Sequence, residues 1–578
     1  MKTIIRKKER INAKLSHKLS LETNLAPLIC EYLCDHGYTS KEKINNFINF
    51  NENNLKNITE MKDVKPFILR LAKAVINHEK IVIYGDYDSD GICATTIFIK
   101  TLRLMGEDPS YFISNRFTEG YGLSIKGMQR LLAQYPDTKL IVTCDNGIVA
   151  FEGVDYAKSK GVDVIVSDHH IASPDGRLPD CPVVCEKRRD ENTSQLEGFC
   201  GAELARRLCI LLTQVLRKYE PLKDELKSLY AFAGFATITD VIELNSSNHF
   251  IAKKGLEEIN NYKKDAPCFA ALKEVLSINS NIDEVSIGYH LGPMINAAGR
   301  ITGDASLPVE LFISNDIVKA KKLALELRKL NEIRQEKSFE QQQLAKKEYD
   351  QFHMENDTFI ILKGIDGESY DEGIAGLIAS YIVENYKKPC ICLAKTENDD
   401  IYKGSARSIE GFNIKVALDN CSQFLEGYGG HSMAAGLSVK KSNINQLHEH
   451  LNDLSKNTEN LIEYIDVDYF ESINNFDFGM IDEYRRYLAP FGVGFEKPTY
   501  ATSGLFDQNK YIMKDKHVKT KLKDGNEAID LLWFNSINKL ERIRPEGKLI
   551  FATGLPSINE FNGTTRIQFI VDYLTLVY

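Results

Sequence analysis

Between residues 61 and 185 the chain alternates short, continuously apolar runs with longer helical stretches. The apolar runs are IVIYG (81–85), KLIVTC (139–144), DVIVS (163–167) and PVV (182–184). Helical patterns such as VAFEGVDYAKSKG, which Gly161 closes, lie between them. Strands that are apolar on both faces and separated by helices predict a parallel, doubly wound sheet. The sequence therefore favours an α/β domain here.

Changes of pattern divide the 578 residues into five expected regions. These are an N-terminal helical segment packed on the next domain (1–60), the parallel-sheet domain (61–305), a long connecting helix (306–352), a smaller α/β domain (353–458) and a β module (459–578). The last region carries two hairpin signals, Asp524-Gly525 and Asn562-Gly563. Alternating strands with such turns predict an OB-like barrel.

The composition is that of a soluble globular protein, with 43% hydrophobic and 26% charged residues. No run of about 18 apolar residues is present, so we expect no membrane span. The basic N-terminus, MKTIIRKKERINAKL, lacks the apolar core of a signal peptide, and the twelve cysteines show no paired framework. We therefore expect a reduced, cytoplasmic protein.

The formal net charge of −9 argues against a basic surface that coats duplex DNA. It does not exclude nucleic acid, because bound cations would offset a cluster of ligand carboxylates. Two basic runs stand out, Lys187-Arg188-Arg189 and the lysines of 509–523. Taken alone, such runs indicate solvated surface.

Acidic and imidazole side chains follow three of the apolar runs. Asp86, Asp88 and Asp90 come directly after 81–85, Asp145 follows 139–144, and Asp168-His169-His170 follows 163–167. Asp240 lies in a later helical segment. Loops at the carboxyl ends of neighbouring parallel strands converge on one crevice. A single aspartate after a strand is usually a turn or cap residue, but three such ends with a His-His pair favour a shared site.

Carboxylates mixed with imidazoles suit Mn²⁺ or Mg²⁺ better than Zn²⁺. The repulsion among the aspartates is tolerable if cations lie between them. The groups are numerous enough for two ions, and two ions about 3.5–4 Å apart can activate a water and stabilise the entering and leaving oxygens of a phosphate. The sequence therefore predicts a two-metal phosphoryl-transfer centre.

Several longer motifs extend over nearly the whole chain. They are DYDSDG (86–91), NRFTEGYGLS (115–124), TCDNGI (143–148), SDHH (167–170), ITDVIEL (238–244), GPMINAAGR (292–300), KGSARSIEGFNI (403–414), GGHSMAAGL (429–437) and LAPFGVGFEKP (488–498). With these motifs the chain resembles the DHH phosphoesterase family, most closely its RecJ branch of single-strand-specific exonucleases. GGHSMAAGL is typical of the associated DHHA1 domain, and LAPFGVGFEKP resembles the entry to the RecJ OB domain.

The resemblance implies a set of metal ligands that also forms the catalytic centre: Asp88, Asp90, Asp145, His169, His170 and Asp240, with Asp86 either as a further ligand or as a group that supports the ligands. Asp168 is expected to orient a neighbouring histidine. Tyr84 departs from the pattern, because many relatives carry a histidine there.

The resemblance also implies substrate contacts in two places. Arg116, Tyr121 and Arg300 would line the strand channel, by phosphate pairing and base stacking. In the second domain, the expected pocket for a terminal 5′-phosphate comprises Ser405, Arg407, Ser408, Gly429, Gly430 and His431. Tyr370-Asp371 stands where relatives often show Trp-His.

The resemblance implies a 5′→3′ exonuclease on single-stranded DNA that releases 5′-mononucleotides in recombination and repair. We expect a monomer, with a single-strand-binding protein and a helicase as candidate partners. The C-terminal module, with Lys519 and Lys521, would lengthen the grip on the strand, whereas Trp533 is expected to pack in its core.

Two other functions stay open at this point. One is a DHH phosphodiesterase acting on short oligonucleotides or cyclic dinucleotides, although such relatives are usually shorter and lack the β module. The other is a catalytically silent DNA-binding scaffold, which the change at Tyr84 would favour.

Overall fold

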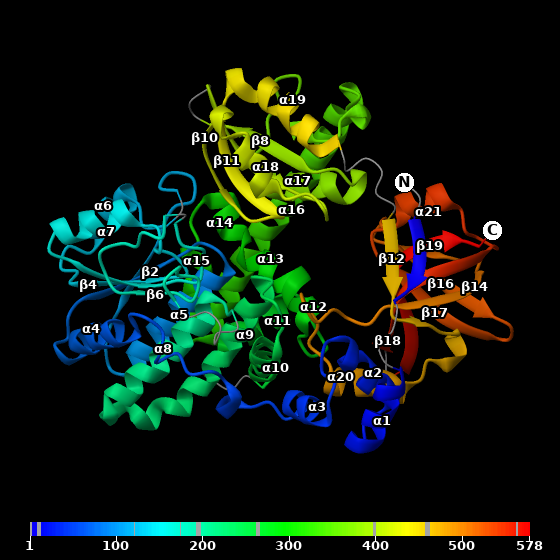
Figure 1. Ribbon diagram of the computed structural model, residues 1–578, viewed down its shortest axis with the longest axis horizontal. Coiled ribbons are helices and arrows are strands. Elements are labelled where there is room, and N and C mark those ends of the chain that lie inside the picture. The colour runs from blue at the N-terminus through cyan, green and yellow to red at the C-terminus, as the bar shows by residue number, and fades with distance from the viewer. Residues whose placement is uncertain are drawn as a thin grey trace. The chain divides into compact units, whose positions relative to one another are not determined.

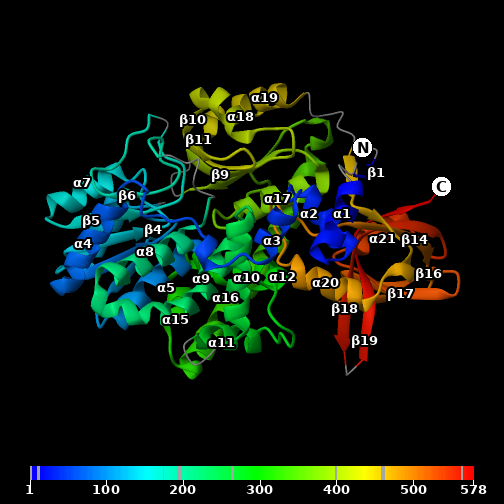
Figure 2. The same cartoon turned by 60° about the horizontal axis from the view of Figure 1, so that its bottom comes forward.

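The computed structural model describes residues 3–8, 13–120, 122–173, 175–191, 198–261, 266–396, 400–456, 463–561 and 564–577. The chain forms two compact units, each with its own fold (Figures 1 and 2). One comprises Met1–Leu55, Glu243–Lys253 and Ile462–Tyr578, and the other comprises Lys56–Ile242 and Lys254–Leu461. We call them the terminal unit and the central unit.

The predicted parallel sheet is confirmed in the central unit. Its strands are β2 (Ile81–Gly85), β3 (Ser110–Ile113), β4 (Leu140–Cys144), β5 (Asp163–Ser167) and β6 (Val183–Val184). They run in the order β3-β2-β4-β5-β6, and every pair is parallel. β3 is the edge strand whose SYFI run was not recognised in the sequence.

Helices cover both faces of this sheet, as continuous apolar strands require. On one face, α6 (Ile125–Gln134) and α7 (Phe151–Ser159) share a core cluster with side chains of β2, β4 and β5. On the other face lie α4 (Val64–Ile76), α5 (Ser89–Leu104) and α8 (Gly201–Val215). The remaining helices of this unit include α9 (Tyr230–Thr239), α11 (Pro267–Val275) and α14 (Ala297–Thr302). Helix α10 (Ser246–Asn260) begins in the terminal unit and continues into the central unit after Lys253.

The long connecting helix is present as α16 (Ile317–Gln351), which is 35 residues long. It begins later than expected, because residues Ser306–Ile313 form a separate helix, α15, and Asp316 then caps α16 by accepting from Val318 N. Asp and Ser residues before a helix favour such a break.

The smaller α/β domain follows α16 in the same unit (Figure 1). Its strands are β7 (Ile360–Leu362), β8 (Cys390–Lys395), β9 (Ile401–Arg407), β10 (Leu425–Gly430) and β11 (Ala434–Lys440). Their order is β10-β11-β9-β8-β7, with only the β7–β8 pair parallel among these strands. Helix α17 (Ala375–Tyr386) packs on one face, and α18 (Ile414–Asn420) and α19 (Ile444–Ser455) pack on the other.

The terminal unit contains a seven-stranded sheet ordered β13-β14-β18-β19-β17-β16-β15. The strands are β13 (Tyr469–Phe470), β14 (Tyr500–Phe506), β15 (Tyr511–Met513), β16 (His517–Asp524), β17 (Glu527–Trp533), β18 (Leu549–Phe561) and β19 (Thr564–Leu576). β14 also pairs with β16 over two residue pairs, so the sheet curls back on itself but the expected barrel is not fully closed. Trp533 is 2% exposed, which confirms its packing role.

The turn at Asp524-Gly525 joins β16 to β17 as predicted, whereas the predicted turn at Asn562-Gly563 lies outside the described residues. N-terminal residues expected against the following domain belong instead to the terminal unit. There β1 (Thr3–Lys7) pairs in parallel with β12 (Glu463–Val467), and α1 (Ala13–Thr23), α2 (Pro27–Asp35) and α3 (Lys41–Ile48) follow. No helix among the described residues is both long and apolar enough to cross a membrane.

Candidate metal centre

The register of the parallel sheet aligns the strand ends that precede the predicted ligands. Gly85 pairs with Cys144, and Cys144 pairs with Ser167. The next residue of each strand is therefore an aspartate at the same edge: Asp86, Asp145 and Asp168, all 3% exposed or less. The predicted convergence at the carboxyl edge rests on this alignment.

Asp88 and Asp90 are held by the N-termini of two helices. Asp88 caps α5: its Oδ1 accepts from Asp90 N at 3.0 Å and from Gly91 N at 3.2 Å. Asp88 is therefore a helix cap, the usual role of an aspartate after a strand, and capping uses one of its two carboxylate oxygens. Both oxygens of Asp90 accept backbone N–H groups that begin α8, from Gly201 at 2.6 Å and Ala202 at 2.7 Å. The sequence did not indicate this second anchor.

Two glycines allow the chain to pass close to these carboxylates. A Cβ on Gly91 would lie 2.7 Å from Asp86 Cα, and one on Gly201 would lie 2.9 Å from Asp145 Cβ. Asp145 itself adopts a left-handed backbone conformation, with φ of +62°. Aspartate tolerates that region better than most residues, so the tight turn after β4 suits this side chain.

Asp168 orients His170, as expected. Its Oδ1 lies 2.8 Å from His170 Nδ1 and accepts from His169 N, and its Oδ2 accepts from Ile148 N at 2.9 Å. Burial opposes ionisation, but the hydrogen bond and charge of His170 hold the pKa of Asp168 below its ordinary value. The same partner raises the pKa of His170 to about 9 against the effect of burial. Because Nδ1 is bonded to Asp168, Nε2 is the nitrogen available to an ion.

All seven predicted ligands meet at this edge. Three overlapping groups have candidate ligand atoms within 4.8 Å of one another: Asp86 with Asp88 and Asp145, Asp145 with His169 and His170, and Asp90 with His169 and Asp240. Asp240 follows the last turn of α9, and its Oδ2 lies 3.6 Å from His169 Nε2.

Cations of the chain do not balance the carboxylates of this cluster, although the charge of His170 lowers the pKa values of Asp90 and Asp240. Burial first, and neighbouring aspartates second, raise the pKa of Asp90 to about 7 and that of Asp240 to about 8. The same causes raise the pKa values of Asp86 and Asp145 well above their ordinary range. Asp86 Oδ1 is buried without a hydrogen-bond partner among the described residues. Divalent cations would supply the missing charge, and the oxygen and imidazole donors fit Mn²⁺ or Mg²⁺.

Tyr84, where many relatives carry a histidine, lies in β2 on the face of the sheet that α6 and α7 cover. It is fully buried, its hydroxyl donates to Gly122 O at 2.9 Å, and its ring packs against Phe112. The side chain therefore supports the chain around Gly122 and belongs to the core shared with α6 and α7.

Four arginines from three parts of the central unit gather beside the metal centre. Burial, and then the charges of Arg116, Arg334 and Arg407, lower the pKa of Arg300 to about 10. No carboxylate forms an ion pair with any of these four guanidinium groups within the described part of the chain. Arg116 also stacks over the Tyr87 ring, 5.0 Å from its centroid. Uncompensated guanidinium groups of this kind suit a phosphate.

The sequence missed Arg334, which lies on α16 and bonds to Asn331 Oδ1. The charged pattern of this helix predicts only a connector, and the role of its arginine follows from the position of α16 beside Arg300. Ser405 joins the same cluster, because Arg407 Nη1 donates to its hydroxyl at 3.0 Å. Gly376 allows this approach, since a Cβ there would lie 2.8 Å from Arg407 Nη2.

The other predicted substrate residues divide into three cases. Ser408 is buried and its hydroxyl bonds to Phe412 O, so the structure turns it inward. Gly429 and His431 are exposed, and Gly430 has φ of +145° where a Cβ would lie 2.4 Å from Ala434 O. Tyr121 lies outside the described residues.

The second departure, Asp371, contacts the connecting helix. Lys337 Nζ lies 2.7 Å from Asp371 Oδ2, and Asp371 N donates to Gln341 Oε1. The neighbouring Glu372 pairs with Lys403 at 2.9 Å. A Cβ on Gly373 would fall 1.9 Å from Arg300 O, so this segment passes directly against the arginine cluster.

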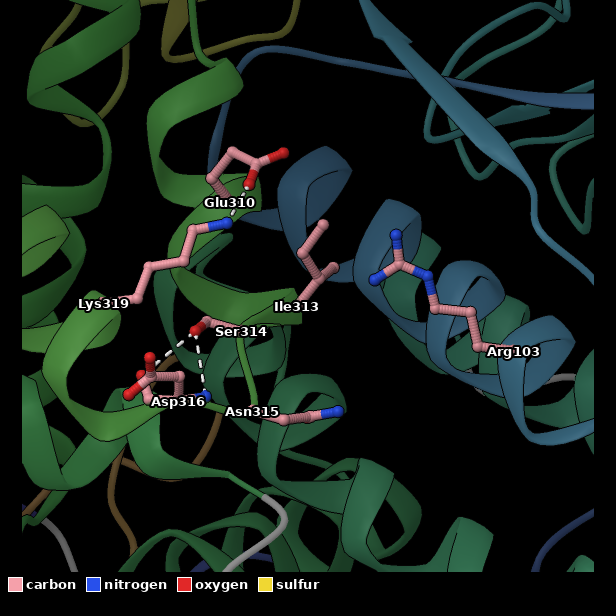
Figure 3. Close-up of a pocket in the computed structure, with 7 residues that line it drawn as sticks. All are labelled: Arg103, Glu310, Ile313, Ser314, Asn315, Asp316 and Lys319. Carbon is pink, nitrogen blue, oxygen red and sulfur yellow. Dashed lines mark hydrogen bonds and ion pairs between the residues drawn. The ribbon is translucent and has the colours of Figure 1, made fainter.

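A separate surface pocket of about 460 Å³ lies at the other end of α5 (Figure 3). Arg103, Ile313 and Asn315 are among its lining residues, and Lys319 points to Glu310, 2.8 Å away. Arg103 is fourteen residues beyond Ser89, which corresponds to about 21 Å along a helix. The pocket is therefore distinct from the metal centre.

Comparison with known proteins agrees with this architecture. Residues 80–233 match the N-terminal domain of the DHH family, residues 356–457 match the DHHA1 domain, and residues 467–573 match the RecJ OB domain. The single-stranded-DNA-specific exonuclease RecJ of Bacillus subtilis (strain 168) is 31% identical over 562 residues, which cover 96% of this chain and 68% of the relative.

Solved structures share the fold. The crystal structure of RecJ in complex with Mn²⁺ from Thermus thermophilus superposes with a TM-score of 0.78 at 21% identity, over 100% of this chain and 80% of that one. The Mg²⁺ complex from the same organism gives 0.72 at 20% identity, over 100% and 79%. The carboxylate cluster here fits such a divalent cation as cofactor. With its DHH, DHHA1 and RecJ OB domains in that order, the chain belongs to the RecJ family.

Proposed function

We propose that the chain is a single-stranded-DNA-specific exonuclease that cleaves from the 5′ end and releases 5′-mononucleotides. The observation that carries this proposal is the proximity of two clusters of opposite charge, one of mostly buried carboxylates and one of partly buried arginines. The charge of Arg116 acts on Asp86, and that of Asp88 acts on Arg300, so the carboxylates and the arginines are neighbours. One cluster suits divalent cations and the other suits phosphates.

The seven ligands would hold two cations, with Asp145 and His169 each shared between adjacent groups. When bound, the two ions would activate water and stabilise the oxygens of an in-line displacement at phosphorus. The chain itself fixes the ligands: backbone N–H groups of α8 hold Asp90, and Asp168 holds His170. Such supporting contacts reduce the reorganisation needed when the reaction takes place.

The arginine cluster would bind phosphates of the strand beside the scissile bond. Arg407 and Ser405 belong to the DHHA1 domain and would take the terminal 5′-phosphate, which limits cleavage to a free end. The RecJ OB domain would extend contact along the strand, through exposed residues such as Lys521. Action in DNA recombination and repair in the cytoplasm, as a monomer working with a single-strand-binding protein and a helicase, completes the proposal.

The test is a time course with Mn²⁺ on matched single strands. A 5′-phosphorylated, 3′-blocked oligonucleotide should release labelled 5′-mononucleotides from its first step. The same oligonucleotide with a blocked 5′ end, and a blunt duplex, should persist. Release from the 3′ end would contradict the proposed polarity, and faster cleavage of dinucleotides than of long strands would favour the short-oligonucleotide phosphodiesterase.

A further inference from the structure

The basic run at 187–189 does not behave as one solvated surface. Arg188 is buried and paired with Asp63 at 2.6 Å and with Asp190 at 2.9 Å. Arg189 is exposed, and its Cδ lies 3.4 Å from the position of a Cβ on Gly176. Lys187 is exposed and forms no ion pair within the described residues. The three cations therefore have three different environments.

Lys187 follows the strand next to the ligand-bearing strands. β6 pairs in parallel with β5, and Val184 lies in register with Ser167. The chain after β6 thus leaves the same carboxyl edge as Asp168, His169 and His170. Contact at this edge is direct, because Cys185 Sγ donates to His170 O at 3.3 Å. Lys187 is two residues beyond that contact.

The charge of Lys187 acts on three groups from three different elements. It lowers the pKa values of His169, after β5, and of Asp240, after α9, in both cases as a smaller effect than burial. It also lowers the pKa of His431, between β10 and β11, where burial is again the larger cause. An ammonium group that influences all three lies on the side of the metal centre that faces the DHHA1 domain.

We infer that Lys187 contacts a phosphate oxygen of the single strand next to the metal centre, as a fourth strand-end contribution to the substrate site. This inference rests on the proposed function and adds a substrate-binding residue to it. Its neighbour Glu186 is buried, with Oε1 accepting from Phe199 N. The charge of Lys187 lowers the pKa of Glu186, but the two side chains form no ion pair within the described residues. An unpaired ammonium near a metal-bound phosphodiester stabilises substrate without adding to the ligand set.

The experiment compares Lys187→Ala, Lys187→Arg and the control Arg189→Ala in the full chain. Arg189→Ala removes the same formal charge two residues away. Binding of a 5′-phosphorylated oligodeoxythymidine is measured by fluorescence anisotropy in EDTA, as a function of NaCl concentration. One lost phosphate contact on a single strand lowers the slope of log affinity against log salt by about 0.7. We expect that change in Lys187→Ala, a smaller one in Lys187→Arg, and none in Arg189→Ala.

The second measurement is cleavage of the same oligonucleotide with Mn²⁺. Lys187→Ala should raise KM severalfold more than it lowers kcat. A salt slope equal to that of the wild type, or an equal change in Arg189→Ala, would overturn the inference. If the salt slopes of the wild type and Lys187→Ala differ as expected but the wild type cleaves no DNA, the proposed function is wrong and the lysine contact is still supported.

Discussion

The central unit buries carboxylates in two places that differ in how their charge is balanced. Glu203 on α8 is fully buried, and its oxygens accept from Arg206 Nε at 2.7 Å and from Arg207 Nε at 2.7 Å. Burial alone would raise the pKa of Glu203, but the two arginines hold it below the ordinary value. At the metal centre the pKa values of Asp90 and Asp145 are instead raised, first by burial and then by the charges of neighbouring aspartates.

The two sites use the same helix in different ways. The backbone N–H groups of Gly201 and Ala202 bind Asp90, and Glu203, the next residue, is neutralised by arginines of the same helix. Burial opposes ionisation at both sites, and the source of the opposite charge differs. Glu203, whose counter-charge comes from Arg206 and Arg207, therefore has a structural role. The carboxylates of the metal centre are instead arranged to bind a cation from solution.

The largest expected effect is the loss of activity in Asp145→Asn. Asp145 belongs to two of the three ligand groups, so the amide should disrupt both and lower kcat at least about a thousandfold. The metal-free variant should unfold at the same or a higher urea concentration than the wild type, because burial and the neighbouring aspartates already disfavour ionisation of Asp145. Cleavage rates and urea unfolding in EDTA check the two parts. A metal-free variant that is clearly less stable would show that the carboxylate of Asp145 stabilises the protein without metal.

Glu203→Ala should have the opposite profile. Removing the carboxylate leaves Arg206 and Arg207 buried without their partner, which costs about 3–5 kcal/mol of unfolding free energy. Urea unfolding in EDTA measures this loss. Mn²⁺ affinity per folded molecule, determined by titration well below the unfolding midpoint, should stay near that of the wild type. If stability changed little, the distinction between the two buried sites would not hold.

The comparison also predicts how pH changes the stabilisation by metal. The pKa values of Asp90, about 7, and Asp240, about 8, exceed those of an unfolded chain, so the folded metal-free protein binds more protons. Its stability therefore falls as pH rises from the ordinary carboxylate range up to those values, by about 1.4 kcal/mol per pH unit for each carboxylate, and levels off above them. Bound Mn²⁺ removes this dependence, so the rise in Tm on adding Mn²⁺ should grow between pH 5.5 and 8.

Glu203 provides the internal control for that experiment. Its pKa is lowered, so its contribution is lost only as pH falls below the ordinary glutamate range, outside the window measured. A Mn²⁺-induced rise in Tm that stays constant from pH 5.5 to 8 would mean that the aspartates are already ionised in the metal-free protein.

Asp168 tests the boundary between the two kinds of site. It lies at the metal centre, yet it resembles Glu203 in having a partner from the chain, the His170 ring at 2.8 Å. Asp168→Asn keeps the side-chain shape but weakens the orientation of His170, and Mn²⁺ affinity should fall about 10- to 100-fold. Calorimetric titration with Mn²⁺ measures the change. A loss as complete as that of Asp145→Asn would instead indicate that Asp168 is itself a ligand.

The ligand set could be predicted from the sequence because one local rule places it. Asp86, Asp145 and Asp168 each follow a strand directly, and parallel strands end at one edge of the sheet. The contacts that hold the ligands could not be predicted in the same way. Asp90 is bound by Gly201 and Ala202, more than a hundred residues later, and nothing local in either segment indicates the other.

The same limit explains the other differences between sequence and structure. Arg334 has the helical spacing of a connector and becomes part of the arginine cluster only through the placement of α16. The parallel pairing of β1 with β12 joins Thr3 to Glu463, which no local pattern can indicate. Closure of the β module depends on the two residue pairs between β14 and β16, and turn signals do not determine that register.

The smallest expected effect concerns backbone strain at Val241, next to the metal centre; Glu203 has no such strained backbone. Val241 follows Asp240 with φ of +56°, at the position where helices usually end in glycine. Val241 N donates to Ile238 O, and Ile242 N donates to Thr237 O, which completes this helix ending. A β-branched residue is strained there, so Val241→Gly should stabilise the protein by up to about 1 kcal/mol, after the entropy lost by glycine is subtracted.

The valine is 63% exposed, so little packing is lost in Val241→Gly, and Val241→Ala provides the matched control because alanine keeps most of the strain. Thermal unfolding in EDTA should rank glycine above valine, with alanine close to valine. If both variants were equally destabilised, the side chain would contribute packing that outweighs its strain. If only Val241→Gly stabilised the protein, the strained backbone of Val241 would be a second cost of forming the metal centre, in addition to the repulsion among its carboxylates. The reason is that the helix end that positions Asp240 requires this strained conformation at Val241.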